Sequence, residues 1–132
     1  MSHLLDVNFL IACGGESHAE HIRASRWLSR AKSFATCPIS EMGFVRVSLS
    51  LAYGASFEDA MAALDAIAAM RTHRFLRDAT RAQSLPPIST SRDVTDAHLV
   101  HLARRNRLKL ATFDVALCEK EWAQGVAEDP TA

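Results

Sequence analysis

The stretch VTDAHLVHLARRNRLKLATFD, from Val94 to Asp114, decides the fold. Its first half carries apolar residues at helical spacing and arginines at the far end, which predicts a helix that Asp93 or Thr95 caps. Asp96 lies in the first turn of that helix, where the exposed N–H groups and the helix dipole favour a carboxylate. An apolar run over residues 108–112 then predicts a strand that ends just before Asp114.

The two acids of this stretch are predicted to meet. In an open α/β sheet, the N-termini of helices and the carboxyl ends of strands lie on the same edge of the sheet. Asp96 opens the helix and Asp114 follows the strand. Both carboxylates can therefore lie in one crevice.

Outward from this stretch, short apolar runs alternate with helical patterns. Strands are expected from His3, over residues 33–37 and 73–76, and at an edge over residues 125–127. Helices are expected over residues 17–32, 38–50 and 56–70, with a short one over residues 116–122. Such alternation favours a three-layer α/β/α sandwich with a short, mainly parallel central sheet. We expect residues 1–127 to form a single domain and residues 128–132 to form a frayed C-terminal tail.

The composition is that of an ordinary globular protein. The 132 residues are 48% hydrophobic and 23% charged, and the formal net charge is zero, so no global field attracts nucleic acid. A local run with Arg71, Arg74, Arg77 and Arg81 can contact phosphates or be a solvated surface. Three widely spaced cysteines without a CxxC motif indicate reduced thiols. We expect a cytoplasmic protein with no signal peptide and no membrane segment.

Four of the fifteen acidic residues stand apart from the solvated ones. Asp6 interrupts an apolar run, Glu41 lies on an otherwise apolar helical stripe, and Asp96 and Asp114 lie at the ends of elements. Four carboxylates in one crevice repel each other, and Mg²⁺ relieves this repulsion through oxygen ligands. Such a site can activate water for in-line attack on a phosphodiester. The alternative is that each acid is a helix cap or a surface residue.

Three segments also resemble a known family. They are LLDVNFLI at Leu4–Ile11, ATCPISEMGFVRV at Ala35–Val47, and VTDAHLVHLARRN with LATFD within Val94–Asp114. Together they resemble the PIN-domain toxins of the VapC type, in the right order and over nearly the whole chain. The resemblance implies a PIN-like fold and an Mg²⁺-dependent endoribonuclease, with Mn²⁺ as a possible substitute, that acts as the toxin of a type II toxin–antitoxin system.

The resemblance also implies roles for particular residues and for partners. The family's acidic quartet falls on Asp6, Glu41, Asp96 and Asp114 without departure, with Glu41 binding metal directly or through water. Asn8 and Thr112 match flanking polar positions that orient ligands or water. A VapB-type antitoxin is expected to occlude the site with a basic side chain, and the substrate is expected to be RNA. Apolar helical surface over residues 17–32 and 38–50 further suggests a homodimer.

Other interpretations have weaker support. His18 with His21, and His98 with His101, are spaced as pairs of metal ligands but lack a third partner, and Cys37 is a possible nucleophile near a helix start. A haloacid-dehalogenase-like phosphatase needs a second acid two residues after Asp6, where this chain has an asparagine. A non-catalytic PIN-like binding module is the third alternative, and the loss of an acid would indicate it.

Overall fold

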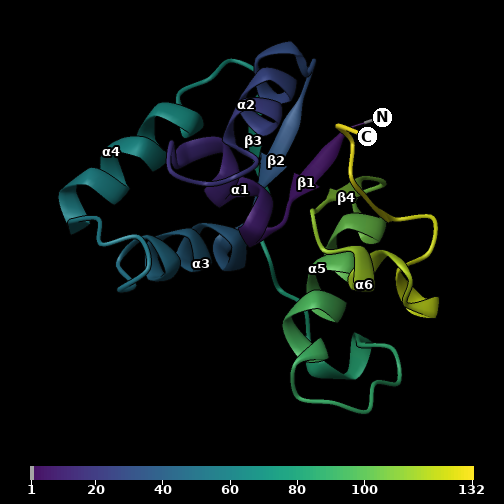
Figure 1. Cartoon of the computed structure of the whole chain (residues 1–132). Coiled ribbons are helices and arrows are strands. Elements are labelled where there is room, and N and C mark those ends of the chain that lie inside the picture. Colours follow the sequence, from purple (N-terminus) through teal and green to yellow (C-terminus); the bar gives the residue numbers. More distant parts are fainter. Residues whose placement is uncertain (1) are drawn as a thin grey trace.

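The computed structural model describes residues 2–132, and a five-stranded sheet lies at its centre (Figure 1). The order of strands is β3–β2–β1–β4–β5, and each neighbouring pair is parallel. The strands are β1 (His3–Leu5), β2 (Phe34–Thr36), β3 (His73–Phe75), β4 (Lys109–Ala111) and β5 (Ala127–Glu128). Because all strands run the same way, their carboxyl ends form one edge.

Helices cover both faces of this sheet. One layer holds α1 (Val7–Gly14), α2 (His21–Arg30), α3 (Pro38–Ser48) and α4 (Phe57–Ala68). The other holds α5 (Asp93–Arg105) and α6 (Val115–Cys118), with the short 3-10 turns η1 (Ala82–Ser84) and η2 (Glu121–Ala123) nearby. Figure 1 shows these two layers on either side of the strands. The predicted three-layer α/β/α sandwich is confirmed. In residues 2–132 no helix is long and apolar enough to cross a membrane.

The core has one half on each side of the sheet. Leu4 and Leu110 pack into the cluster beneath α5, whereas Leu5 and Ala111 pack against α1–α4. Successive side chains of a strand point to opposite faces, so these short strands are buried on both sides. Burial of each leucine stabilises the fold by about 1.5–3 kcal/mol. The carboxyl edge of the sheet is therefore held by strands that are packed on both faces.

The helix predicted from Ser17 begins instead at His21. The Glu20 N–H donates to Nδ1 of His18 at 2.9 Å, and the His21 N–H donates to the His18 carbonyl at 3.0 Å. The His18 ring thus takes a backbone donor, and the segment forms turns before the helix begins. The later start leaves the His18 side chain beside the edge of the sheet.

The predicted caps of α5 are also wrong. Its N-cap residue is Arg92, whose side chain makes no capping hydrogen bond. The Asp93 and Val94 N–H groups donate to the Thr90 and Ser91 carbonyls, so the preceding turn already satisfies them. Asp93 is therefore available to face Lys120, with Oδ2 and Nζ 3.6 Å apart.

Glu128 contradicts the predicted frayed tail, because it belongs to β5. Its carbonyl accepts the Thr112 N–H at 3.0 Å, and its carboxylate contacts His3 Nε2 at 2.8 Å and Lys109 Nζ at 3.0 Å. The edge strand also begins later than predicted, because Gly125 takes a positive φ of 79° in the preceding turn. Side-chain partners that are distant in sequence thus order this end of the chain.

A first prediction concerns the close packing of α1 on α3. A Cβ added at Gly43 would lie 2.5 Å from Cγ2 of Val7, a stiff β-branched side chain. We expect Gly43→Ala to lower the free energy of unfolding by about 1–3 kcal/mol, although alanine favours a helix more than glycine does.

Urea unfolding of Gly43→Ala, Val7→Ala and the double variant measures this effect. In the double variant, Val7→Ala removes the methyl groups that the new Cβ would meet, so it should restore much of the stability that Gly43→Ala loses. The two substitutions should therefore show a favourable coupling energy. Strictly additive effects of the two substitutions would show that the two helices do not touch at this point.

Candidate active site at the carboxyl edge of the sheet

Two of the predicted acids cap the helices that follow neighbouring strands. Asp6 follows β1, and its Oδ1 accepts the Val7 N–H at 2.7 Å at the start of α1. Asp114 lies beyond β4, and its Oδ1 accepts the Leu117 N–H at 3.1 Å at the start of α6. Aspartate suits both places because it accepts N–H groups that a helix start leaves without partners. Since β1 and β4 are neighbours, the two carboxylates lie at the same edge.

Thr112 and Asn8 connect these two helix starts. The fully buried Thr112 hydroxyl donates to Asp6 Oδ2 at 2.8 Å and accepts the Asp114 N–H at 3.1 Å. Asn8 Nδ2 donates to the same hydroxyl at 3.3 Å, and Asn8 Oδ1 accepts the Phe113 N–H at 3.2 Å. The two polar residues predicted beside the acids therefore fix the orientation of Asp6 and the backbone of Asp114.

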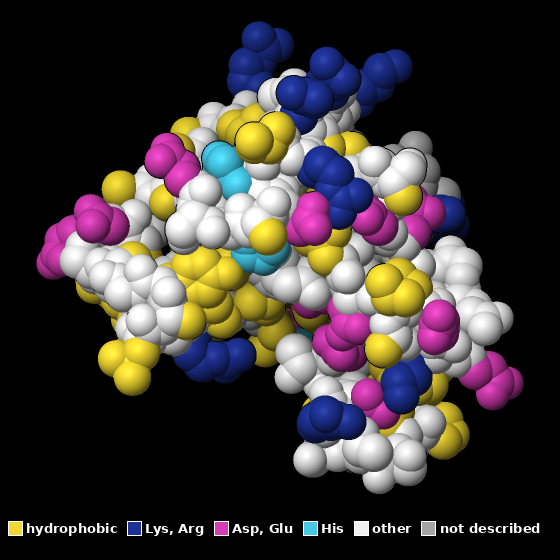
Figure 2. All heavy atoms as spheres, viewed as in Figure 1, with side chains coloured by type: hydrophobic (Ala, Val, Ile, Leu, Met, Phe, Trp, Pro, Cys, Tyr) yellow, Lys and Arg dark blue, Asp and Glu magenta, His cyan; other side chains and the backbone are white. Residues whose placement is uncertain are grey.

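One cavity of about 340 Å³ brings three acids together. Asp6, Asp96 and Asp114 line it, with Asp96 reaching it from the first turn of α5. Other polar residues of its lining are Asn8, His18, Arg46, Tyr53 and Thr95. Figure 2 shows acidic side chains gathered over α5 and α6 on the face seen in Figure 1. The prediction that Asp96 and Asp114 meet agrees with this geometry.

The environment of the cavity opposes the ionised form of these acids. Burial raises the pKa of Asp6, and the Asp114 charge adds to this, against the hydrogen bonds from Thr112 and Val7. Burial, together with the charges of Asp6, Asp114 and Asp93, raises the pKa of Asp96 to about 6, against the opposing charge of Lys120. The cavity therefore holds more negative charge than its own residues compensate.

The donor set fits a hard divalent cation. Each acid offers carboxylate oxygens, which are ligands that Mg²⁺ and Mn²⁺ prefer, and a bound cation relieves their repulsion. Within residues 2–132, no three His, Cys, Asp or Glu side chains are already close enough to hold a metal ion. The fit thus lies in the chemistry of the donors and in their excess charge.

Glu41 is held apart from the other three acids. It does not line the cavity, and its Oε2 accepts the hydroxyl of Thr36 at 2.7 Å. Thr36 Oγ1 is also 2.7 Å from His73 Nε2, and burial lowers the pKa of this histidine although the Glu41 charge opposes the effect. Because the Thr36 hydroxyl donates its proton to Glu41, it accepts the hydrogen bond from His73, whose Nε2 then carries the proton. The structure thus brings three of the four predicted acids together.

The weaker candidates have partners elsewhere. Nδ1 of His21 lies 2.8 Å from the Ala12 carbonyl, and Nε2 of His98 lies 2.6 Å from Asp78 Oδ2. Cys37 is fully buried, and burial raises the pKa of its thiol, which suits a core residue and not a nucleophile. Neither histidine pair forms a metal site in the described chain.

Sequence reasoning missed Arg46 and the cavity position of His18. Arg46 interrupts the apolar run Phe44–Val47 near the end of α3, much as Asp6 interrupts its own run. This interruption could have indicated a functional residue. Its side chain is exposed and lines the acidic cavity. His18 gave no such signal, because the turn that places it depends on its own ring.

Comparison with known proteins connects this geometry with a family. Residues 3–123 match the PIN domain family. The chain is 42% identical over 121 residues to "Ribonuclease VapC38" of Mycobacterium tuberculosis, covering 86% of each chain. It is 38% identical over 129 residues to "Ribonuclease VapC39" of the same species, covering 90% of this chain and 93% of that protein.

Two solved structures have a similar fold. Mycobacterium tuberculosis VapC20, described as a sarcin-ricin loop cleaving toxin, matches with a TM-score of 0.63 and 18% identity over 89% of this chain and 92% of that one. VapBC2 from Rickettsia felis, bound to a DNA fragment from its promoter, matches with a TM-score of 0.62 and 14% identity over 97% and 98%. These two structures show the same fold, whereas the family match and the relatives of higher identity establish that the chain belongs to the PIN-domain ribonucleases of the VapC type.

Proposed function

We propose that this chain is the endoribonuclease toxin of a type II toxin–antitoxin system and hydrolyses RNA phosphodiesters with a divalent metal. One observation carries the proposal: Asp6, Asp96 and Asp114 line a single cavity at the carboxyl edge of the sheet. The VapC ribonucleases among its relatives support the same reaction. A haloacid-dehalogenase-like phosphatase is not favoured, because the side chain two residues after Asp6 is the amide of Asn8, which bonds to Phe113 and Thr112.

Mg²⁺ is the proposed cofactor, and Mn²⁺ is its proposed substitute. Asp6, Asp96 and Asp114 would hold the ion, and Glu41 would bind it directly or through water after leaving Thr36. Bound there, the ion supplies charge stabilisation and an activated water for attack on phosphorus. Ribonucleases of this family are generally metal-dependent, but which metal this chain binds is part of the proposal.

Thr112 and Asn8 orient the acids of the cavity, and Arg46 is available to the substrate. The Thr112 hydroxyl holds Oδ2 of Asp6 and the Val7 N–H holds Oδ1, so this carboxylate has a fixed orientation at the cavity. Asn8 fixes the backbone that leads to Asp114. Arg46 is the exposed cation of the cavity lining, and its guanidinium suits a phosphate that would otherwise face three carboxylates.

A VapB-type antitoxin and a second copy of the chain are the proposed protein partners. VapBC2 of Rickettsia felis is a toxin–antitoxin structure with the same fold, which supports an antitoxin here. We expect the antitoxin to place a basic side chain among the acids, where it replaces metal. The exposed apolar residues Met42, Leu51 and Phe57 on and between α3 and α4 support the homodimer, and Figure 2 shows apolar side chains there. A cytoplasmic location is proposed from the reduced thiols.

An assay on structured RNA tests the proposed function directly. We expect cleavage with Mg²⁺ or Mn²⁺ and no cleavage in excess EDTA, because the carboxylates alone provide no electrophile. A phosphate monoester offered in parallel separates the phosphatase, and RNA binding without cleavage indicates a non-catalytic module. Full cleavage in excess EDTA would overturn the metal-dependent mechanism.

Asp6→Asn should abolish cleavage and leave the metal-free fold about as stable as before. Asparagine keeps the acceptor for the Val7 N–H. The Thr112 hydroxyl can turn its proton to Asn8 Oδ1, 3.4 Å away, and accept from the new amide in place of Asn8 Nδ2. Loss of a buried charge next to Asp114 offsets any weakening of these bonds, so the free energy of unfolding should change by less than about 1 kcal/mol.

Thermal melts with EDTA or Mg²⁺ measure this balance, with the exposed Asp65→Asn on α4 as the matched control. Mg²⁺ should raise the Tm of the parent and of the control more than that of Asp6→Asn, because a ligand of the folded state stabilises it. If Asp6→Asn loses several kcal/mol without metal, Asp6 is a structural residue and the proposed site is wrong.

Asp96→Asn should stabilise the metal-free protein at neutral pH and not in acid. The pKa of Asp96 is about 6 when folded and 3.8 ordinarily, so between these values the folded state holds a proton that the unfolded chain releases. The stability that this group contributes therefore falls as pH rises through that window. With a discount for solvent screening, we expect a gain of about 1–2 kcal/mol at pH near 7.5 and almost none near 4.

Urea unfolding in EDTA at both pH values checks the sign. Asp96 lies at a helix N-terminus that favours its charge by about 0.3–1 kcal/mol, so the substitution also measures whether burial and repulsion outweigh the dipole. Asp65→Asn again controls for net charge. An equal effect of Asp96→Asn on stability at the two pH values would show that burial and repulsion do not raise the pKa of this carboxyl.

A further inference from the structure

A second cavity, of about 390 Å³, lies between the segment after β3 and the C-terminal half of α5. Three exposed arginines line it, Arg77 and Arg81 from the segment and Arg105 from the last turn of the helix. His101, Thr80 and Ser84 supply further polar groups. No acidic residue is part of this lining, in contrast to the cavity of the three acids.

A buried contact fixes the segment on α5 and so shapes the cavity. Asp78 Oδ2 lies 2.6 Å from Nε2 of His98, one turn before His101, and these side chains are only 8% and 19% exposed. Asp78 Oδ1 accepts the Thr80 N–H at 3.0 Å. Burial opposes the charge of Asp78, but these bonds and the histidine lower its pKa, so the acid that follows Arg77 in the chain is occupied. The cavity is therefore preorganised.

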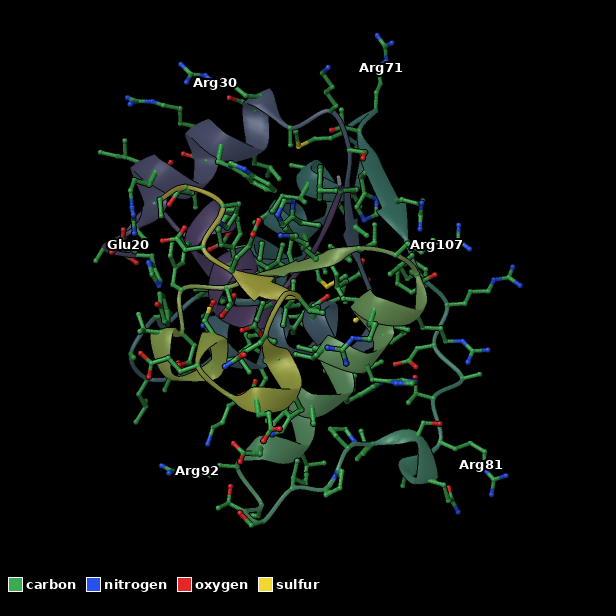
Figure 3. The ribbon with its side chains drawn as sticks, turned by 90° about the vertical axis from the view of Figure 1, so that its right-hand side faces the viewer. Glu20, Arg30, Arg71, Arg81, Arg92 and Arg107 are labelled. Carbon is green, nitrogen blue, oxygen red and sulfur yellow. The ribbon has the colours of Figure 1, made fainter. Side chains whose placement is uncertain are left out.

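The three guanidinium groups are available to a ligand. Among the side chains of residues 2–132, none forms an ion pair or a hydrogen bond with Arg77, Arg81 or Arg105. Figure 3 shows Arg81 and Arg107 on one side of the molecule, with Glu20 on the opposite side. The lining of this cavity is therefore a local group of positive charge on a chain whose formal net charge is zero.

The chemistry of the lining favours a phosphate over a peptide. Guanidinium forks match phosphate oxygens in two parallel hydrogen bonds, and hydroxyl and imidazole groups complete such a site. The only large apolar side chain of the lining, Leu102, is buried, so a peptide would find no apolar anchor. RNA backbones bring phosphates in series, and arginine contacts with them supply affinity without reading sequence.

We propose that this cavity is an exosite, defined by Arg77, Arg81 and Arg105, which binds backbone phosphates of the RNA that the acidic cavity cleaves. The proposal rests on the proposed function. From Asp96 at the acidic cavity to Arg105, α5 rises about 14 Å at about 1.5 Å per residue. Nine residues of an α-helix make about two and a half turns, so the two positions face opposite sides of α5, and an RNA that reaches both must cross the helix as well as follow it. The exosite holds the strand, and the acids act on it.

The test compares two variants with the same change in charge. The exosite variant is Arg77→Ala, Arg81→Ala and Arg105→Ala, and the control variant is Arg26→Ala, Arg30→Ala and Lys32→Ala on and after α2, all exposed. Figure 3 shows Arg30 far from Arg81. Fluorescence anisotropy of a labelled single-stranded RNA in EDTA measures binding without cleavage, over a series of salt concentrations.

We expect the exosite variant to bind this RNA about tenfold more weakly and the control variant to stay within about twofold of the parent. The slope of log K against log salt should fall by roughly 2, since each phosphate contact on a single strand contributes about 0.7. With metal, kcat/KM should fall for the long RNA, mainly through KM, and stay unchanged for a dinucleotide that reaches only the acids.

The binding measurement keeps this proposal separate from the proposed function. If the parent cleaves no RNA with any metal, the anisotropy in EDTA still decides whether the exosite binds it. Arg81→Ala alone, at the exposed start of η1, gives a second measurement if the triple variant does not fold. Equal RNA affinity and equal salt slope for the exosite and control variants would overturn the proposal. It would also be overturned if polyglutamate bound to the three arginines and the affinity for RNA stayed unchanged.

Discussion

The hydroxyl of Thr112 is the contact on which the proposed active site depends. It donates to Asp6 beyond β1 and accepts the backbone of Asp114 beyond β4, so it joins the ends of two parallel strands. A hydroxyl can do this because it is both donor and acceptor, whereas valine, its isostere, is neither. The main-chain bond from the Asp6 N–H to the Ala111 carbonyl continues the sheet beneath it. The register of β1 and β4 in the sheet thus determines how far apart the carboxylates of Asp6 and Asp114 lie.

The same edge stores electrostatic free energy. Burial and mutual repulsion raise the pKa of Asp6 and Asp96, although each lies where a helix start favours negative charge. Helix dipoles contribute only about 0.3–1 kcal/mol at such positions, so burial and repulsion decide the balance. The core, with Leu4 and Leu5 fully buried, supplies the stability that tolerates this arrangement. A cation, from a metal or from an antitoxin side chain, would relieve it.

The sequence could predict what local rules determine. Strand, turn and helix patterns located the layers, and the acids at strand ends located the cavity, because parallel strands end at one edge. It could not predict contacts that join distant segments. Glu41 is turned away by Thr36 and His73, Glu128 is ordered by His3, and Asp93 faces Lys120 and caps nothing. In each case the partner is identified only once the fold brings two segments together.

Charge is sorted along α5, although the chain as a whole is neutral. Its first turn carries Asp93 and Asp96 and its last turn carries Arg104 and Arg105, an order that the helix dipole favours at both ends. The dipole alone does not account for Arg77 and Arg81, which lie on a separate segment that Asp78 fixes against the helix. The helix thus carries an acidic cavity at one end and a basic one at the other. This separation suits the proposed reaction, because the carboxylates of the acidic cavity repel the RNA polyanion, which the arginines attract.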